Sequence, residues 1–301
     1  MLMQSNICNA EMIYRDIDWN SVWKDLYEKN EECRGRGDCA SIWASRDRAR
    51  AFLAQSRERP ERILQDIEGL PLKADSNVLD IGAGPGTLAV PLASRVASVT
   101  AVEPAAGMAE VMGEHALEKG VTNLSIVRKR WEDVDFKKDL DGPYDLVIAR
   151  HSLGMPNIRD AIKAMCEASS EWVYLFWFAG STGWEKAMID LWPKLHGREY
   201  RSGPKADMLY NVIYSMGIYP NMETMQMEYT RKFSDIDAAV NEFREQYMIS
   251  SPAQEEILRQ HLRETLSRAG DGLQDSMMTR QVRLWWSVDK HDQRLPGCRF
   301  P

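Results

Sequence analysis

The chain has 301 residues, of which 44% are hydrophobic and 28% charged, and its 45 acidic and 38 basic side chains give a formal net charge of −7. This composition excludes a wholly disordered chain, and the acidic excess argues against a globally basic nucleic-acid binder. The longest apolar run, Trp172–Gly180, falls well short of the roughly 20 residues of a membrane-spanning helix, so no membrane span is expected. Five cysteines and a start without a signal peptide pattern predict a reduced, cytoplasmic protein.

Residues 1–75 are predicted to form a helical cap. Apolar side chains recur at helical spacing within Trp19–Tyr27, Ile42–Leu53 and Ile63–Ile67. The last of these helices is expected to stop at Gly69, because glycine commonly ends a helix.

The pattern changes at Asn77, where short apolar runs begin to alternate with helical stretches. Strands are expected over Asn77–Ile81, Ser98–Val102, Leu124–Arg128, Tyr144–Ala149 and Trp172–Phe178, and helices over Thr87–Ser94, Gly107–Lys119 and Arg159–Ser169. Alternation of apolar strands with helices predicts an α/β fold whose parallel sheet is covered on both faces.

The pattern is looser after Gly180. Helices are expected over Trp184–Leu195, Lys205–Met216 and within Ser234–Gly270, and strands over Met222–Phe233 and Thr279–Val288. The two late strands would complete a mostly parallel, Rossmann-like sheet with an antiparallel pair. We therefore expect a core over residues 76–290 with helical insertions at about 181–220 and 234–272, followed by a loose tail over residues 291–301.

A glycine-rich turn follows the first predicted strand. Val78–Thr87 reads VLDIGAGPGT, so an apolar strand runs into Gly82, Gly84 and Gly86 and then into a helix. Glycines allow a tight turn and let a ligand approach the backbone. The start of the helix adds free N–H groups and the positive end of its dipole. The turn is therefore a candidate cofactor site.

An acidic residue follows at a suitable distance. Glu103 directly follows the second predicted strand, 21 residues after Gly82. In dinucleotide-type sites a carboxylate about 20 residues beyond the glycine turn binds ribose hydroxyls. The glycine spacing is G-x-G-x-G rather than G-x-G-x-x-G, which counts against a nicotinamide-dependent dehydrogenase.

The segment Leu79–Ala93, LDIGAGPGTLAVPLA, resembles the first motif of the class I S-adenosylmethionine-dependent methyltransferases, and Val99–Met112, VTAVEPAAGMAEVM, resembles their second. The resemblance covers about Asn77 to Gly180 closely and the flanks loosely. It implies a methyltransferase with S-adenosyl-L-methionine as cofactor and S-adenosyl-L-homocysteine as product.

The resemblance assigns roles around the turn. Gly82, Ala83 and Gly84 would cradle the methionine part of the cofactor. Asp80 would order the loop or the cofactor's amino group, and Glu103 would hold both ribose hydroxyls.

Two further segments would meet the adenine ring. Pro104 and Met108 would lie against the adenine, although Met108 could equally be a core residue of its helix. Trp131 could stack on the ring and offer its backbone N–H. Arg130 stands where the family usually has an acidic residue, so Glu132 or Asp133 would supply the contact to the adenine amino group.

The fourth strand of the resemblance ends at Arg150 and His151. Ligands bind at the carboxyl ends of strands in an open parallel sheet. Arg150 could hold a carboxylate of the cofactor or substrate, and His151 is the candidate general base. A base is needed only when the acceptor arrives protonated.

Residues outside the core are expected to enclose the acceptor. Trp43 and Arg46 resemble a segment that closes over the cofactor in many family members, and Trp184 would join an aromatic lid. The other aromatic residues of that lid are Trp192, Tyr200, Tyr210, Tyr214, Tyr219, Phe243 and Tyr247. This composition favours a small or medium organic acceptor in an apolar pocket.

Three alternatives remain at this level. The first is an RNA methyltransferase, because eight basic residues stand against four acidic ones within Arg34–Arg62. The second is a cofactor-binding homologue without catalysis. The third, suggested by Cys33 and Cys39, is a metalloid or thiol-linked acceptor. No metal site or membrane partner is expected, nucleic acid is disfavoured as a partner, and the oligomeric state is left open.

Overall fold

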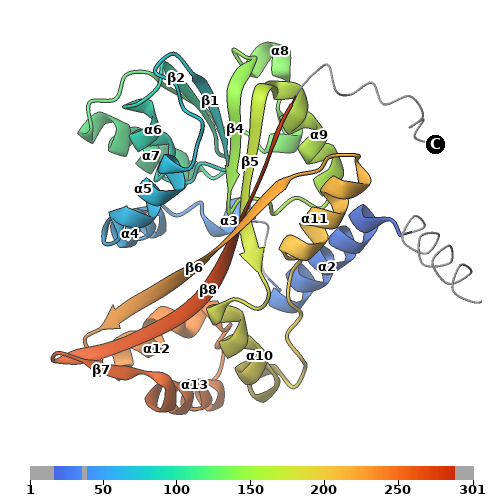
Figure 1. Ribbon diagram of the computed structural model, residues 1–301. Helices are drawn as coiled ribbons and strands as arrows, with labels where there is room; N and C mark the ends of the chain where they lie inside the picture. The colour runs from blue at the N-terminus through green and yellow to red at the C-terminus, as the bar shows by residue number, and fades with distance from the viewer. Residues whose placement is uncertain (1–16, 36–38, 289–301) are drawn as a thin grey trace, which may run out of the picture.

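The structure is a computed structural model, and it describes residues 17–35 and 39–288 (Figure 1). Its strands form one eight-stranded sheet in the order β3-β2-β1-β4-β5-β8-β6, with β7 paired to β8. The strands are β1 (Asn77–Ile81), β2 (Ser98–Val102), β3 (Leu124–Val127), β4 (Tyr144–Arg150), β5 (Ser169–Ala179), β6 (Asn221–Phe233), β7 (Ser267–Ala269) and β8 (Gly272–Ser287). The predicted tail over residues 291–301 lies outside the described part of the chain.

The sheet has the predicted mixed direction. Strands β1 to β5 pair in parallel, whereas β8 runs antiparallel to both β5 and β6. This confirms a Rossmann-like sheet that is completed by an antiparallel pair. The bounds of β1 and β2 are as predicted, because four of the five residues in each strand are buried and apolar runs mark them clearly.

The end of the chain differs from the prediction in one place. Residues up to Gly270 were expected to be helical, yet Ser267–Ala269 form β7, and β8 begins at Gly272 instead of Thr279. The early part of β8 is held by backbone pairing with the end of β6, such as Leu273 with Phe233. Its polar residues give no apolar alternation, so the sequence pattern did not reveal the strand.

Helices surround the sheet. They are α2 (Trp19–Arg34), α3 (Cys39–Ile42), α4 (Arg46–Arg57), α5 (Pro60–Glu68), α6 (Ala89–Ala93), α7 (Ala106–Glu118), α8 (Phe136–Asp139), α9 (Ile158–Ala168), α10 (Gly183–His196), α11 (Ala206–Ser215), α12 (Ile236–Gln246) and α13 (Pro252–Thr265), with a short 3-10 turn at Trp131–Asp133. No helix within the described residues combines the length and apolar character needed to cross a membrane.

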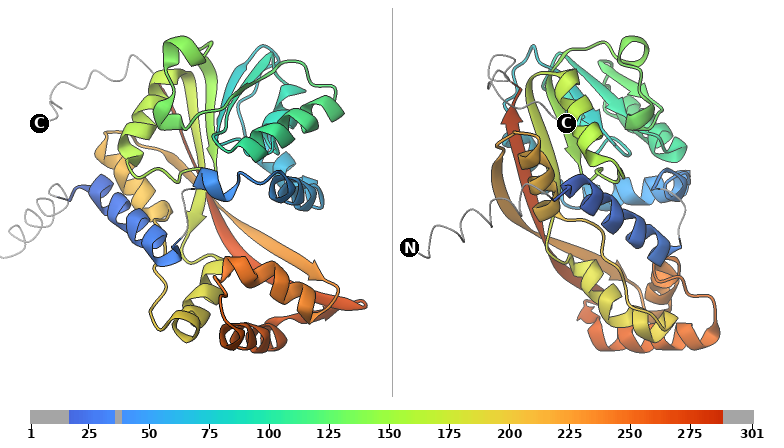
Figure 2. Two further views of the ribbon diagram at one scale, coloured as in Figure 1. Left: turned by 180° about the vertical axis from the view of Figure 1, so that it is seen from behind. Right: turned by 90° about the vertical axis from the view of Figure 1, so that its right-hand side faces the viewer.

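The two faces of the sheet carry different helices (Figure 2). On one face α5, α6 and α7 contribute Ile67, Leu92 and Met112 to a continuous apolar core. On the other face α2, α9 and α11 bury side chains such as Trp23 and Ile162. Burial of these side chains is the main stabilising contribution to the fold.

Strands β6 and β8 extend beyond the parallel part of the sheet and form an arm (Figure 1). Helices α10, α12 and α13 pack together beside this arm through residues such as Leu191, Phe243 and Leu258. Asp235 caps the start of α12 by accepting a hydrogen bond of 2.8 Å from the Ala238 N–H, a role that aspartate commonly has at helix N-termini.

The carboxyl ends of the parallel strands lie beside α3 and the start of α4 (Figure 1). The connection at Ala44–Arg46 packs closely against the first turn of α7. A Cβ atom added to Gly107 would lie 2.5 Å from the Ala44 carbonyl oxygen, so only glycine fits there. The N-terminal helices therefore reach the edge of the sheet where the predicted cofactor residues stand.

Candidate functional site

The glycine turn begins directly after β1. Gly82 has a φ of 69°, and a Cβ atom added to it would lie 2.2 Å from the Cβ of Ser152. Both facts require glycine at this position. The N–H groups of Gly82 and Ala83 donate to the Val102 carbonyl at 2.7 and 3.2 Å. These bonds fix the turn to the end of β2.

Glu103 lies against the same turn. Its Oε2 accepts a hydrogen bond of 2.8 Å from the Gly84 N–H, and its Oε1 accepts one of 2.8 Å from the Ala105 N–H. Burial raises the pKa of Glu103, while these two backbone bonds oppose the shift. Because a carboxylate has about four lone-pair sites, Glu103 can still accept further bonds from ligand hydroxyls.

Gly84 leaves space beside the carboxylate. It has a φ of 58°, and a Cβ atom added to it would meet no atom within 4 Å. Nearby, Asp80 is 1% exposed, and its Oδ2 has no hydrogen-bond partner. A buried polar atom without a partner is costly, and a bound cationic or N–H group would relieve that cost. These residues therefore fit a cofactor with an ammonium group and a ribose.

Burial raises the pKa of Asp80 to about 7, with Arg150 opposing the shift and Glu103 adding to it. The Arg150 side chain is directed to α5, where its Nε donates to Asp66 Oδ2 at 2.7 Å. Asp66 Oδ1 in turn accepts 3.0 Å from Gln281 Nε2 on β8. The Nε of Arg150 is therefore paired with a buried aspartate, and the prediction that this residue anchors a ligand carboxylate stays a prediction.

His151 occupies a strained position at the end of β4. It has a φ of 57°, which is uncommon for a residue other than glycine. Its ring stacks on Phe178 with 4.5 Å between ring centroids, and its Nε2 has no hydrogen-bond partner. Burial and then Arg150 lower its pKa well below 6.5, and Gln281 opposes the shift only in part. The imidazole is therefore neutral at pH 7.

Two predicted adenine contacts are side chains of the core. Trp131 is 4% exposed and donates from Nε1 to the Ala161 carbonyl at 3.0 Å, so its ring is not placed to stack on a ligand. Met108 is buried between α4 and α7 beside Leu53 and Val111. Met108 thus takes the core role that the sequence left open beside the adenine contact, and Trp131 shows that an apolar side chain after a strand serves the core as well as a ligand.

The other predicted adenine contacts remain predictions. Pro104 is half-buried directly after Glu103, and Glu132 and Asp133 are exposed on the 3-10 turn.

Trp43, which is predicted to be part of the lid, is half-buried and packs edge-on against Phe52 of α4.

The predicted aromatic lid is not assembled as one group. Trp184 of α10 contacts Phe178 and Tyr229. The remaining aromatic residues lie in two other groups. One group packs in the arm and contains the contacting pairs Trp192–Tyr200 and Phe243–Tyr247. The other lies along and beyond α11, where Tyr214 contacts both Tyr210 and Tyr219. Sequence reasoning missed Phe178 and Tyr229 because only the pairing of β5, β8 and β6 brings them to Trp184.

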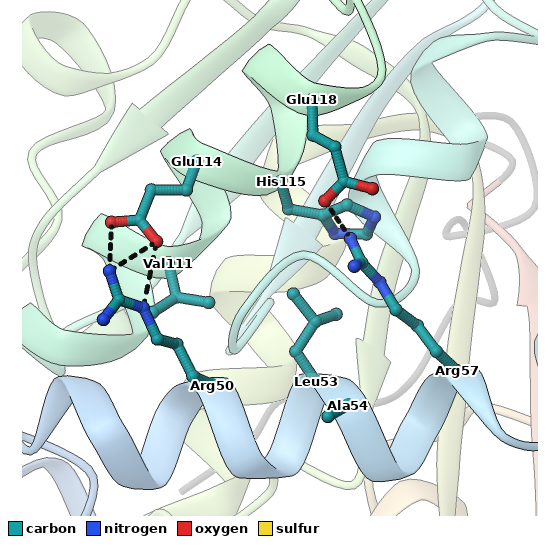
Figure 3. A pocket seen from close by; sticks show the side chains of 8 residues that line it. All are labelled: Arg50, Leu53, Ala54, Arg57, Val111, Glu114, His115 and Glu118. Atoms are coloured by element: carbon teal, nitrogen blue, oxygen red, sulfur yellow. Dashed lines mark hydrogen bonds and ion pairs between the residues drawn. The ribbon is translucent and has the colours of Figure 1, made fainter.

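The predicted basic stretch is largely neutralised. Arg46 and Arg50 pair with Glu114, Arg57 with Glu118, Arg48 with Glu245 and Arg59 with Glu228. Arg46 is therefore held by α7, and its place in a lid stays a prediction. The pair of Arg50 with Glu114 and the pair of Arg57 with Glu118 border a hollow of about 190 Å³ between α4 and α7 (Figure 3).

Of Cys33 and Cys39, the structure describes the side chain of Cys33 alone. The Cys33 thiol lies 3.4 Å from the Arg201 N–H, and the Cys39 side chain lies outside the described residues. Within the described chain, no three His, Cys, Asp or Glu side chains are placed to hold a metal ion.

Residues 78–170 match a protein-family model described as a methyltransferase domain. Two solved structures share the fold. The first is a putative methyltransferase from Bacillus halodurans, which is 13% identical with a TM-score of 0.53; the match covers 77% of this chain and 99% of that chain. The second is the YcgJ protein from Bacillus subtilis, which is 16% identical with a TM-score of 0.51; the match covers 74% of this chain and 97% of that chain.

Two curated relatives match shorter parts. An uncharacterized protein of Haemophilus influenzae is 28% identical over 164 residues, which is 54% of this chain and 59% of that protein. A 23S rRNA (uracil(1939)-C(5))-methyltransferase of Pseudomonas aeruginosa is 34% identical over 106 residues, 31% of this chain and 24% of the relative. The chain thus spans less than two thirds of either relative.

The sheet order, the glycine turn and the carboxylate at the end of β2 define a nucleotide-type cofactor site on a Rossmann-like sheet. Residues 78–170 thus carry a methyltransferase domain, and S-adenosylmethionine is the cofactor that this domain implies.

Proposed function

We propose that this protein transfers a methyl group from S-adenosylmethionine to a small or medium organic acceptor. The observation that carries the proposal is the contact between the glycine turn and the carboxylate, where the Gly84 N–H donates to Glu103 at 2.8 Å. The cofactor, when bound, supplies a methyl group already activated on a sulfonium. The protein therefore has to bind, orient and exclude water.

Each residue of the turn has a separate task in this proposal. Gly82, Ala83 and Gly84 leave the backbone open to the methionine part of the cofactor. Glu103 accepts hydrogen bonds from the ribose hydroxyls with its remaining lone pairs. Asp80, whose Oδ2 has no partner, stabilises the positively charged end of the ligand.

His151 would act only on an acceptor that carries a proton. Its Nε2 is unpartnered and its lowered pKa keeps the imidazole neutral, so a ring nitrogen has a lone pair that would accept a proton from a hydroxyl as the oxygen gains the methyl group, although the lowered pKa makes it a weak base. The proton would then pass to solvent. An amine or thiolate acceptor does not need this step.

The charge arrangement favours a small acceptor over RNA. Five of the arginines on α4 and at the start of α5 are bound to glutamates of α7, α12 and β6. Phosphate binding requires cationic groups that can replace counterions, and ion-paired arginines offer less of this. The likeness to the rRNA methyltransferase spans only 24% of that relative, so RNA is the second candidate.

The test is calorimetric titration of the wild-type protein with S-adenosylmethionine, S-adenosylhomocysteine and NADH. The proposal expects binding of the first two ligands and no binding of NADH. Binding of NADH alone would overturn it. A salt series with rRNA separates the second candidate, because RNA affinity would fall steeply with salt at about one logarithmic unit per phosphate contacted.

A further inference from the structure

Four half-buried rings, here called the ring row, extend from the end of β4 toward the arm. The row consists of His151, Phe178, Trp184 and Tyr229. Successive ring centroids lie 4.5, 5.0 and 5.6 Å apart, stacked at the first contact and edge-on at the other two. Such rings bury a large apolar area at defined geometry, so the row forms an aromatic wall that begins at the end of β4.

A cation stands at the far end of the ring row. The Arg62 guanidinium carbon lies 4.9 Å from the centroid of the Tyr229 ring, and Arg62 Nη2 is buried without a hydrogen-bond partner. Among the described residues Arg62 forms no salt bridge, since Glu228 is bound to Arg59 instead. A buried guanidinium atom without an acceptor is costly, and burial lowers the pKa of Arg62.

The near end of the ring row carries two further unsatisfied atoms. Gln281 Oε1 and His151 Nε2 are both buried without a partner. Asp66 connects the two ends, because it accepts from Gln281 at 3.0 Å and lies one helical turn from Arg62 on α5. The cation, the rings and these polar atoms therefore belong to one cluster beside the end of β4.

The charges of this cluster are not balanced. Arg150 is neutralised by Asp66 at 2.7 Å, which leaves Arg62 as the cation without a salt bridge. A guanidinium binds a carboxylate with two parallel hydrogen bonds, and an aromatic wall beside it favours a planar body. The cluster thus combines the two features that recognise an aromatic carboxylate.

We propose that the methyl acceptor is an aromatic acid, with its ring on Phe178, Trp184 and Tyr229 and its carboxylate on Arg62. This inference rests on the proposed function, because it places the acceptor beside the cofactor turn. It adds the chemical class of the acceptor and the residue that selects it. The position of His151 at the other end of the row directs the remainder of the acceptor toward the end of β4.

The test compares acids with matched neutral compounds. Para-hydroxybenzoate, hydroxynaphthoate and their carboxamides are titrated into the wild-type protein by calorimetry, with and without S-adenosylhomocysteine. We expect at least one acid to bind about tenfold or more tightly than its carboxamide, as expected for a charge-assisted hydrogen bond. Equal affinities of each acid and its carboxamide, or no binding of any acid, would overturn the proposal.

Variants assign the effect to the cluster. Arg62→Gln should lower the affinity for the acid to that for the carboxamide, and it should leave the affinity for the carboxamide unchanged. Tyr229→Leu should lower the affinity for both compounds. Arg263→Gln on α13, which removes an exposed arginine, is the matched control and should change neither. An acid preference that survives Arg62→Gln in a folded protein would contradict the assignment.

Cofactor binding is measured on the same samples. If the wild type binds S-adenosylmethionine and no acid, the acceptor class is wrong and the proposed function stands. If it binds no S-adenosylmethionine, the proposed function fails whatever the acids do. Arg62→Gln is expected to leave S-adenosylmethionine affinity unchanged, since Arg62 does not contact the glycine turn.

Discussion

The Gly84 N–H donates a hydrogen bond of 2.8 Å to Oε2 of Glu103, and this bond joins the turn after β1 to the end of β2. The second oxygen of Glu103 is held by the Ala105 N–H at 2.8 Å. The carboxylate is thus preorganised by the backbone on both sides. A ligand that bonds to it does so without first ordering the side chain.

Replacement of Gly82 by alanine should damage both stability and cofactor binding. The new Cβ would lie 2.2 Å from Ser152 Cβ, and the residue would be strained at a positive φ, a cost of about 1–3 kcal/mol. Gly113→Ala is the matched control, since its Cβ would meet nothing within 4 Å and alanine favours a helix by about 1 kcal/mol. Urea unfolding measures the free energy of unfolding of both variants, and equal values for the two would contradict this account of the turn.

The stability of the protein should depend on the ionisation of Asp80. Its pKa in the folded state is about 7 against an ordinary value of 3.8, so the folded protein holds the proton more tightly than the unfolded chain. The stabilising contribution of the protonated Asp80 carboxyl to the free energy of unfolding is therefore fully present below about pH 4. It is lost as the pH rises to about 7, and its upper bound is roughly 4 kcal/mol.

Asp80→Asn removes this titration. The unfolding free energy of the variant relative to wild type should increase between pH 4 and pH 7 and then level off. Chemical denaturation at a series of pH values measures the difference. A constant difference across that range would show that Asp80 is not shifted upward.

Loss of the buried ion pair between Asp66 and Arg150 should be costly. The two side chains are 5% and 14% exposed and lie 2.7 Å apart, and Asp66→Ala would leave a buried arginine without its partner, at a cost of about 3–5 kcal/mol. The control is Asp25→Ala, which breaks an exposed pair with Lys29 and should cost about 0.5 kcal/mol or less. Similar unfolding midpoints for both variants would contradict the structural role of Asp66.

The parallel half of the fold was predictable because its signals are local. Strands β1 and β2 are mostly apolar and buried, and the glycine turn and Glu103 stand at a recognisable spacing. Each of these features depends on residues that are close in the sequence. The structure places the glycine turn and Glu103 together at the carboxyl ends of β1 and β2, as expected from the direction of parallel strands.

The rest of the site depends on contacts between distant residues. Arg150 is paired with Asp66, which is 84 residues earlier in the chain, and no spacing rule predicts that pair. Trp131 offered the same ambiguity, because a tryptophan after a strand can face a ligand or the core. Tyr229 joins Trp184 only because β6 pairs with β8 and extends beyond the parallel strands.

The central claim is that Glu103 and the glycine turn bind S-adenosylmethionine, and calorimetry of Glu103→Ala tests it most directly. The control is Glu110→Ala, which removes an exposed carboxylate from α7, and circular dichroism shows that both variants are folded. We expect Glu103→Ala to weaken binding by at least about 100-fold, because two charge-assisted hydrogen bonds of about 1.5–3 kcal/mol each are lost, and Glu110→Ala to bind like wild type. Wild-type affinity in a folded Glu103→Ala protein would contradict the claim.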